Sequence, residues 1–310
     1  MKPWHLCIGA IVLLACSAAP QPGPAQPATT TATAYHGGDA PLSRAADKVM
    51  RLIPAGGFIS GSTQQERMEA YDAFHRSAGY DAARRGRWFD REHRRHRQEL
   101  HGFKIDLSPV TNAAYAEFVA DTHRAPPHVS KKAWQAQHFS QNYDTQVKRF
   151  NWTAAGPPPG RADHPVLLVS FFDAREYCHW RGHVVGSPRR LPTAAEYEKA
   201  ARGSAGFNYP WGNDWDRTKL NSGDTPPRDT VSVGSYPRGA SPYGVLGMAG
   251  NVFQWTSTPW QGNKNMRTVK GSAWEDHAGV GRGASQHGRP VGIHHAIVGF
   301  RCAADLPAKP

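Results

Sequence analysis

Glycine and proline interrupt this chain so often that long helices and strands are not expected. The 310 residues include 31 glycines and 25 prolines, well above the average combined share of about 12%. Glycine adds freedom to the unfolded backbone and proline ends helices, so both weaken regular elements. The ten tryptophans supply large apolar surfaces against which loops can pack. We therefore expect a loop-rich fold held together by aromatic side chains, in one domain of about 270 residues or two small ones.

The first 40 residues have the pattern of an exported protein. Residues 1–15 contain a lysine and an apolar run that is too short for a membrane span of about 20 residues and predicts a signal peptide. The sequence Leu13-Leu14-Ala15-Cys16 is similar to a bacterial lipobox and predicts a lipid on Cys16, with an ordinary cleaved signal as the alternative. Residues 16–40 are poor in large apolar groups and predict a flexible tether. We therefore predict an exported lipoprotein, anchored to a membrane and facing the periplasm, with its folded domain in residues 41–310.

Export limits what the cysteines can do. Cys7 is lost with the signal peptide and Cys16 carries the lipid, so that Cys178 and Cys302 remain. In an oxidising compartment, two cysteines so far apart are expected to form a disulfide rather than to stay free thiols. The mature chain would then have no thiol for nucleophilic or metal chemistry.

Positive charge is concentrated in one segment of the chain. The formal net charge is +12, and much of the excess lies in residues 83–97, ARRGRWFDREHRRHR. We interpret this segment as a solvated face, with an anionic membrane surface or an acidic substrate as alternative partners. No nucleic-acid partner is expected for an exported lipoprotein.

Helices are predicted where a capping residue precedes apolar residues at helical spacing. The capping residues and their helices are Thr111 before residues 112–122, Ser170 before residues 171–180 and Thr193 before residues 194–202, which Gly203 ends. Asp173 and Glu196 follow their caps by three residues, which is the capping-box pattern. The second helix places Cys178 on its inner face, where a partner near the C-terminus could reach it.

Several sequence blocks together identify a family. The blocks, in chain order, are RLIPAGGFISGS (51–62), PVTNAAYAEFV (109–119), DHPVLLVSFFDAREYCHW (163–180), RLPTAAEYEKAARG (190–203), YPWGN (209–213), YGVLGMAGNVFQWT (243–256) and GFRCAAD (299–305). Their order and spacing resemble the formylglycine-generating enzyme, or sulfatase-modifying factor, superfamily. The resemblance implies an α+β fold related to C-type lectins, with low regular secondary structure. It also implies a disulfide between Cys178 and Cys302.

The resemblance gives the triplet Glu275-Asp276-His277 a place in the expected site. Formylglycine-generating enzymes oxidise a sulfatase cysteine with oxygen, using copper held by two thiolates that follow a GGS turn. In this chain the turn is present as Gly271-Ser272, but Glu275 and Val280 stand where the thiolates would be. A carboxylate and a valine cannot replace two soft sulfur ligands for Cu(I). We therefore expect the triplet to line the ancestral cleft, with no copper site and no formylglycine formation by the family mechanism.

Three hypotheses on function follow. The first is a binding or accessory domain with an unknown periplasmic ligand or protein partner. The second is a metal-dependent oxidase, because the superfamily includes oxidases that mature the siderophore pyoverdine; the triplet would then supply acid–base groups. Histidines that could bind its metal are His287, His294 and His295, and the sequence leaves the presence of iron open. The third is a true sulfatase activator whose catalytic groups lie at other positions. For the triplet itself, the simplest interpretation is a solvated turn that takes part in no chemistry.

The family also binds structural calcium through oxygen-rich loops. Asn221, Ser222 and Asp224 resemble the first of those sites, with Asp229 as an alternative carboxylate. The second site departs from the family pattern around Gly250 and Val252, because Gln254 replaces a glutamate and Gly247 replaces an asparagine. Calcium is therefore predicted at Asn221, Ser222 and Asp224 only.

Overall fold

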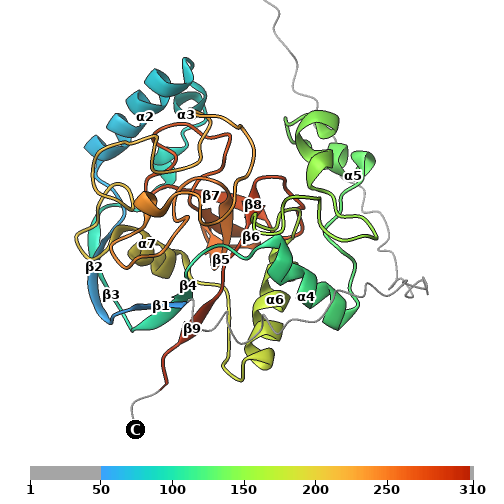
Figure 1. Ribbon diagram of the computed structural model, residues 1–310. Coiled ribbons are helices and arrows are strands. Elements are labelled where there is room, and N and C mark those ends of the chain that lie inside the picture. The colour runs from blue at the N-terminus through green and yellow to red at the C-terminus, as the bar shows by residue number, and fades with distance from the viewer. Residues whose placement is uncertain (1–49, 308–310) are drawn as a thin grey trace, which may run out of the picture. The chain divides into compact units, whose positions relative to one another are not determined.

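The computed structural model describes residues 50–307, in which three small sheets are surrounded by short helices and long loops (Figure 1). The largest sheet has the strand order β7-β6-β5-β8. Its strands are β5 (Phe253–Trp260), β6 (Asn263–Lys270), β7 (Gln286–Pro290) and β8 (Val298–Gly299). β5 and β6 form an antiparallel hairpin, and β8 runs parallel to β5. The segment that carries the triplet, residues 271–285, connects β6 to β7 and is therefore held at both ends by this sheet.

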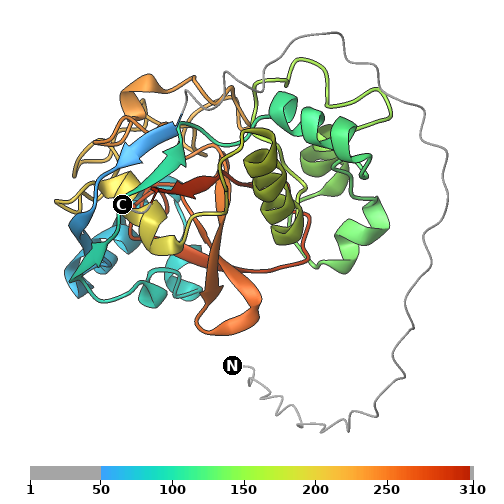
Figure 2. The ribbon, with the colours of Figure 1, turned by 90° about the horizontal axis from the view of Figure 1, so that it is seen from below.

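A second sheet joins the two ends of the described chain. Its antiparallel strands are β1 (Met50–Ile53), β4 (Phe103–Asp106) and β9 (Ala303–Asp305), and β4 lies between the other two. Figure 2 shows β1, β4 and β9 together on one side of the molecule. A further antiparallel pair, β2 (Gly56–Ser60) and β3 (His96–Leu100), extends from the same side.

The three predicted helices are present with the predicted caps. They are α4 (Asn112–Thr122), α6 (Phe171–Val184) and α7 (Ala194–Arg202). The side chains of Ser170 and Thr193 accept hydrogen bonds from the backbone of Asp173 and Glu196, whose carboxylates accept in return. Such reciprocal bonds satisfy backbone donors that a helix otherwise leaves free. α6 extends four residues beyond the predicted range.

The longest helix of the described residues, α2 (Gln64–Ala78), was not predicted. It begins at a complete capping box of Thr63 and Glu66, and Gly79 ends it in the left-handed conformation with φ 79°. The remaining short elements are α3 (Ala82–Arg85), η2 (Phe89–Arg91), α5 (Lys131–Ala136), η3 (Tyr143–Val147), η4 (Lys148–Phe150) and η5 (Pro237–Gly239). Between Gly203 and Val252 only η5 is regular, so the expected low content of regular structure is confirmed.

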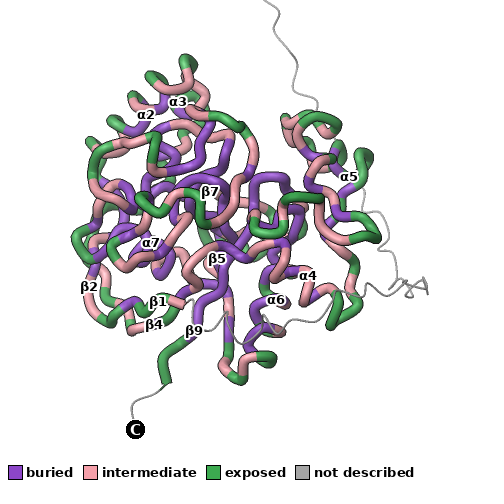
Figure 3. Tube along the Cα trace, viewed as in Figure 1, coloured by how far each residue is buried: buried purple, intermediate pink, exposed green. Residues whose placement is uncertain are grey.

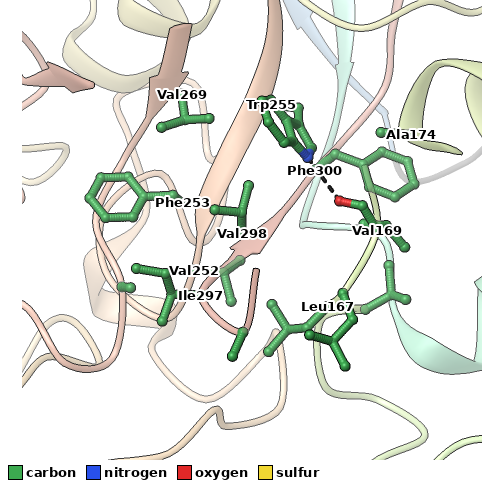
Figure 4. Packing of buried hydrophobic residues seen from close by; sticks show 14 of the residues in the cluster. Leu167, Val169, Ala174, Val252, Phe253, Trp255, Val269, Ile297, Val298 and Phe300 are labelled. Carbon is green, nitrogen blue, oxygen red and sulfur yellow. Dashed lines mark hydrogen bonds between the residues drawn. The ribbon is translucent and has the colours of Figure 1, made fainter. Parts of the chain in front are cut away.

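The main hydrophobic core is formed by the largest sheet, helices α4 and α6, and apolar residues of α2, α3 and α5. Figure 4 shows Trp255 of β5 packed near Phe300, with its indole nitrogen donating a hydrogen bond of 3.1 Å to the carbonyl oxygen of Val169. Both aromatic side chains are fully buried. Figure 3 shows that buried residues follow the central strands, whereas α2 and α3 keep exposed outer faces. Trp255 thus connects strand β5 to the loop before α6, in agreement with the expectation that aromatic side chains hold the loops together.

The predicted disulfide is present. The sulfur atoms of Cys178 in α6 and Cys302, just before β9, are 2.03 Å apart and their Cα atoms are 5.6 Å apart. Both side chains are buried. The bond links the main core to the sheet that contains both ends of the described chain.

The basic segment 83–97 is mostly exposed, as predicted for a solvated face. Several of its arginines pair with nearby acids, among them Arg84 with Asp72 and Arg95 with Glu66. The predicted signal peptide, Cys16 with its predicted lipid, and the whole predicted tether (16–40) lie outside the described residues. Within residues 50–307, no helix has the length and apolar character needed to cross a membrane.

Candidate functional site

The segment that carries the triplet begins with a tight turn. Gly271 has φ 83°, and a Cβ atom there would lie 2.8 Å from the Tyr197 hydroxyl oxygen, so glycine is required. The Ser272 hydroxyl oxygen accepts a 2.8 Å hydrogen bond from the backbone N–H of Gly250. The Trp274 backbone N–H donates to the carbonyl oxygen of Asn251 at 3.0 Å. These contacts hold the first half of the triplet segment against the turn before β5.

Glu275 faces a neighbour that is distant in sequence. Its Oε1 atom accepts a 2.6 Å hydrogen bond from the side-chain amide of Gln141. Burial raises the pKa of Glu275, and the Gln141 hydrogen bond and the charges of Arg289 and Arg149 oppose that rise. The carboxylate is therefore a hydrogen-bonded group at the wall of a cavity and not a freely solvated turn residue.

Asp276 is placed differently by the same turn. Its Oδ2 atom accepts a 2.7 Å hydrogen bond from the backbone N–H of Ala273. Burial, with a further contribution from the negative charge of Glu275, raises the pKa of Asp276 to about 7 against opposing effects from Ala273, Arg289 and His277. A carboxyl group with such a pKa can both donate and accept a proton near neutral pH.

Glu275 and Asp276 line one cavity of about 530 Å³, which we call the carboxylate cavity. Its other polar residues include Gln141, His287, Arg289 and His295. Its aromatic walls are Trp88, Phe139, Phe253 and Trp260. Burial lowers the pKa of His287 and of His295 to about 3, so both imidazoles are neutral at pH 7. The cavity therefore combines two carboxyl groups, the guanidinium groups of Arg91 and Arg289, and neutral imidazoles with aromatic side chains.

Three lining residues of the carboxylate cavity carry a buried polar atom that has no hydrogen-bond partner. The atoms are Gln141 Oε1, His287 Nε2 and Arg289 Nε. Leaving a buried donor or acceptor unpaired costs about 1 to 3 kcal/mol. Their presence around one cavity indicates a binding site rather than a packed interior.

His277, the third member of the triplet, points to a different cavity. Its Nδ1 atom lies 2.5 Å from Asp224 Oδ1 and 3.1 Å from the Ser77 hydroxyl oxygen, and that hydroxyl donates to the same carboxylate oxygen. Burial alone would raise the pKa of Asp224, but hydrogen bonds from His277 and Ser77 outweigh it, so this pKa lies below its ordinary value. The expectation that all three triplet residues share one cleft is therefore wrong. The contacts with Asp224 and Ser77 hold the His277 side chain in a cavity that Glu275 and Asp276 do not line.

Val280, which stands at the second expected thiolate position, lies in the main core with no exposed surface. It lines neither of the two cavities.

Of the candidate metal-binding histidines, His287 and His295 line the carboxylate cavity, whereas His294 does not. The Nδ1 atom of His294 instead lies 2.9 Å from the carbonyl oxygen of Leu168.

The predicted calcium ligands have several contacts within the protein. Asn221 donates its side-chain amide to the Asp229 carbonyl and to Asn251, and its Oδ1 atom is buried without a partner. Asp224 lines the cavity of His277, which Asn221 does not line. Asp229, the alternative ligand, is held by both terminal nitrogens of Arg161 at 2.9 and 2.7 Å. Ser222 is buried. The unpartnered Asn221 oxygen is compatible with a calcium ion, and the full ligand set stays a prediction.

Gln254, at the second family calcium position, is fully bonded within the protein. Its amide nitrogen donates to the Tyr197 hydroxyl and to the Gly247 carbonyl, and its oxygen accepts from Arg301. Throughout residues 50–307, no group of three or more His, Cys, Asp or Glu side chains is arranged to hold a metal ion.

Sequence reasoning missed Gln141, Arg289 and the four aromatic residues of the carboxylate cavity. No local pattern marks Gln141, which lies 134 residues before the carboxylate that it contacts. Arg289 follows His287 in β7, and the alternation of side chains along a strand could have suggested that the two share a face.

Comparison with known proteins settles the family. Residues 40–306 match the model of a family described as the sulfatase-modifying factor enzyme 1-like domain. The chain belongs to this family. It is 34% identical over 246 residues to inactive C-alpha-formylglycine-generating enzyme 2 of Bos taurus, a match that covers 67% of this chain and 79% of that one. The resemblance seen in the sequence blocks is thereby confirmed.

Two further comparisons concern oxygenase relatives and the fold. The chain is 33% identical over 197 residues to hercynine oxygenase of Mycolicibacterium smegmatis, covering 59% of this chain but only 44% of that protein. Its fold is similar to that of PvdO from Pseudomonas aeruginosa, with a TM-score of 0.61, 19% identity, and coverage of 83% of this chain and 94% of that one. The structure therefore has the sulfatase-modifying-factor fold.

Proposed function

We propose that this chain is a ligand-binding or accessory member of the sulfatase-modifying factor family that does not form formylglycine. The observation that carries the proposal is the state of the two expected thiolate positions. Glu275 is hydrogen-bonded to Gln141 at the cavity wall, and Val280 is packed into the core. The two cysteines among the described residues are bonded to each other. The name of the bovine relative, an inactive formylglycine-generating enzyme, supports the same view.

The carboxylate cavity is the proposed ligand site. Its aromatic walls favour a molecule with an apolar or flat part, because such surfaces supply most of the binding energy of small-molecule sites. The carboxyl groups of Glu275 and Asp276, the guanidinium of Arg289 and the unpartnered Gln141 and His287 atoms require hydrogen-bond donors and acceptors on the ligand. We infer a small polar molecule that carries both kinds of group.

We further propose that the domain works outside the cytoplasm. In this proposal residues 1–15 are removed, Cys16 carries a lipid, and the tether up to residue 40 leaves the domain free above the membrane surface. The ligand would then be a periplasmic molecule or protein segment, and the Cys178–Cys302 disulfide suits an oxidising compartment.

A metal-dependent oxidase is the second candidate, favoured by the similarity to hercynine oxygenase. The raised pKa of Asp276, about 7, would suit a proton-transfer group in such an enzyme. His287 and His295 line the same cavity, but the residues described do not form a ready metal site. We therefore derive no catalytic step through a metal.

The test combines an activity assay with metal analysis. The purified full chain is incubated with copper, oxygen and a cysteine peptide derived from a sulfatase, and mass spectrometry measures aldehyde formation. We expect an unmodified peptide with the wild-type chain and with Glu275→Cys, because Val280 still supplies no second sulfur. Aldehyde formation by the unaltered protein would overturn the proposal, and stoichiometric iron or copper in the purified protein would favour the oxidase.

Ligand binding is tested separately by thermal shift with a panel of amino acids, amines and hydroxy acids. A compound that stabilises the wild-type protein should lose its effect in Arg289→Gln and keep it in Arg97→Gln, an exposed arginine on β3. Shifts that survive Arg289→Gln would place the ligand elsewhere.

A further inference from the structure

A second cavity, of about 700 Å³, lies where His277 points; we call it the arginine cavity. It is lined by the C-terminal end of α2 and the residues just after it, by residues 215–228 of the long loop between α7 and η5, and by His277 and Ala278 of the triplet segment. In Figure 1 the end of α2 lies beside α3 at the top of the molecule. The arginine cavity and the carboxylate cavity share no lining residue.

Positive charge dominates the arginine cavity. Arg76, Arg217 and Arg228 line it, and all three are exposed. Several arginines elsewhere have acidic partners, as in the pair of Arg161 with Asp229 and the buried pair of Arg282 with Glu92. Among the ion pairs of residues 50–307, none involves the three cavity arginines. Three guanidinium groups around one hollow leave a net positive potential that attracts anions.

Asp224, the one acidic residue that lines the arginine cavity, offsets only part of this positive charge. Asp224 is engaged by His277 and by the Ser77 hydroxyl. Because both contacts to the imidazole use Nδ1, Nε2 is the ring nitrogen of His277 that can contact a ligand. These hydrogen bonds fix Asp224, His277 and Ser77 relative to one another in the cavity lining.

Two aromatic rings complete the arginine cavity. Tyr80 is 48% exposed, which is unusual for a large aromatic side chain, and its ring lies edge-on to His277 with centroids 6.2 Å apart. Trp215 is partly exposed and packs against Tyr209 and Trp211, with centroid distances of 5.4 and 6.4 Å. Rings held in this way can stack on a flat group of a ligand.

We propose that the arginine cavity binds an organic anion in which a phosphate or carboxylate group is attached to a flat ring. Arginine binds both groups through paired N–H donors, and Arg76, Arg217 and Arg228 supply those donors. Tyr80 and Trp215 contact the ring. This site goes beyond the proposed function, because it uses other residues and requires no ligand in the carboxylate cavity.

The test is isothermal titration of the full chain with phenyl phosphate and with benzoate, which represent the two anionic groups on one ring. Inorganic phosphate and phenol represent the halves of the first probe. We expect at least one ring-bearing anion to bind more tightly than both phosphate and phenol, and to bind more weakly as salt is added. Whichever anion binds more tightly identifies the anionic group of the ligand.

Variants locate the binding. Arg76→Gln, Arg217→Gln and Arg228→Gln should each weaken binding by about tenfold, the effect of losing one charge-assisted contact. Arg94→Gln removes the same charge from an exposed arginine outside the cavity and should leave affinity unchanged. Trp215→Ala should weaken binding of the ring-bearing anion but not of inorganic phosphate. Thermal unfolding of each variant verifies its fold.

The proposal would be overturned if neither phenyl phosphate nor benzoate bound to the protein. It would also be overturned if the three cavity variants bound the ring-bearing anion as tightly as Arg94→Gln does. Arg289→Gln, which alters the carboxylate cavity, should not change the titration. The two proposals can therefore fail independently.

Discussion

Replacing Asp276 with asparagine should remove a pH dependence of stability that burial of this carboxyl group creates. Its pKa rises from 3.8 to about 7 on folding, so the folded state holds the proton more tightly than the unfolded state. A group of this kind favours folding most below the unfolded pKa, and that contribution is lost as pH rises through the folded pKa. A difference of roughly 3 pKa units corresponds to about 4 kcal/mol. The asparagine side chain would keep an oxygen to accept the hydrogen bond from Ala273.

The assay is urea unfolding of wild type and Asp276→Asn between pH 4 and pH 8. The free energy of unfolding of the wild type, minus that of the variant, should fall by about 4 kcal/mol across this range. Asp229→Asn is the control. Burial raises the pKa of Asp229, but the hydrogen bonds from Arg161 lower it more, so its contribution is lost only as pH falls through that lowered pKa, below the tested range. The wild-type-minus-Asp229→Asn difference should therefore stay nearly constant from pH 4 to pH 8. A wild-type-minus-Asp276→Asn difference that stays flat or rises from pH 4 to pH 8 would refute this account of Asp276.

Two further predictions concern the cysteines. Replacing both Cys178 and Cys302 with alanine should lower the free energy of unfolding by about 4 to 5 kcal/mol in the chain-entropy model, since the bond spans 124 residues. Urea unfolding measures this loss, and a reductant should destabilise the wild type but not the variant. Cys16→Ser should move the protein from the membrane fraction to the soluble fraction with an unchanged melting temperature; continued membrane association would show that another feature, such as the basic segment, holds it there.

Local signals allowed α4, α6 and α7 to be predicted. Thr111, Ser170 and Thr193 satisfy backbone donors within three residues of their own position, so nearby sequence determines these helix starts. The same signal was present at Thr63 and Glu66 for α2 and was overlooked. Recognition of the ordered sequence blocks then supplied the family fold and the cysteine pairing.

The candidate site was less predictable because its contacts are distant in sequence. Glu275 depends on Gln141, and His277 depends on Ser77, which lies 200 residues earlier. The raised pKa of Asp276 follows from burial, which a single sequence does not reveal. The adjacent positions of Glu275, Asp276 and His277 in the sequence therefore suggested one site. Tertiary contacts instead place Glu275 and Asp276 in one cavity and His277 in another.

The sheet of β1, β4 and β9 also determines when the chain can finish folding. β4 pairs with β1 on one edge. Its other edge stays unpaired until β9, about 200 residues further along the chain, is in place. Closing so long a loop costs entropy before strand pairing repays it, which slows folding. The partner of Cys178 also arrives only with this last strand. Until β9 pairs, the chain is an intermediate with an open strand edge, a species that is prone to aggregate.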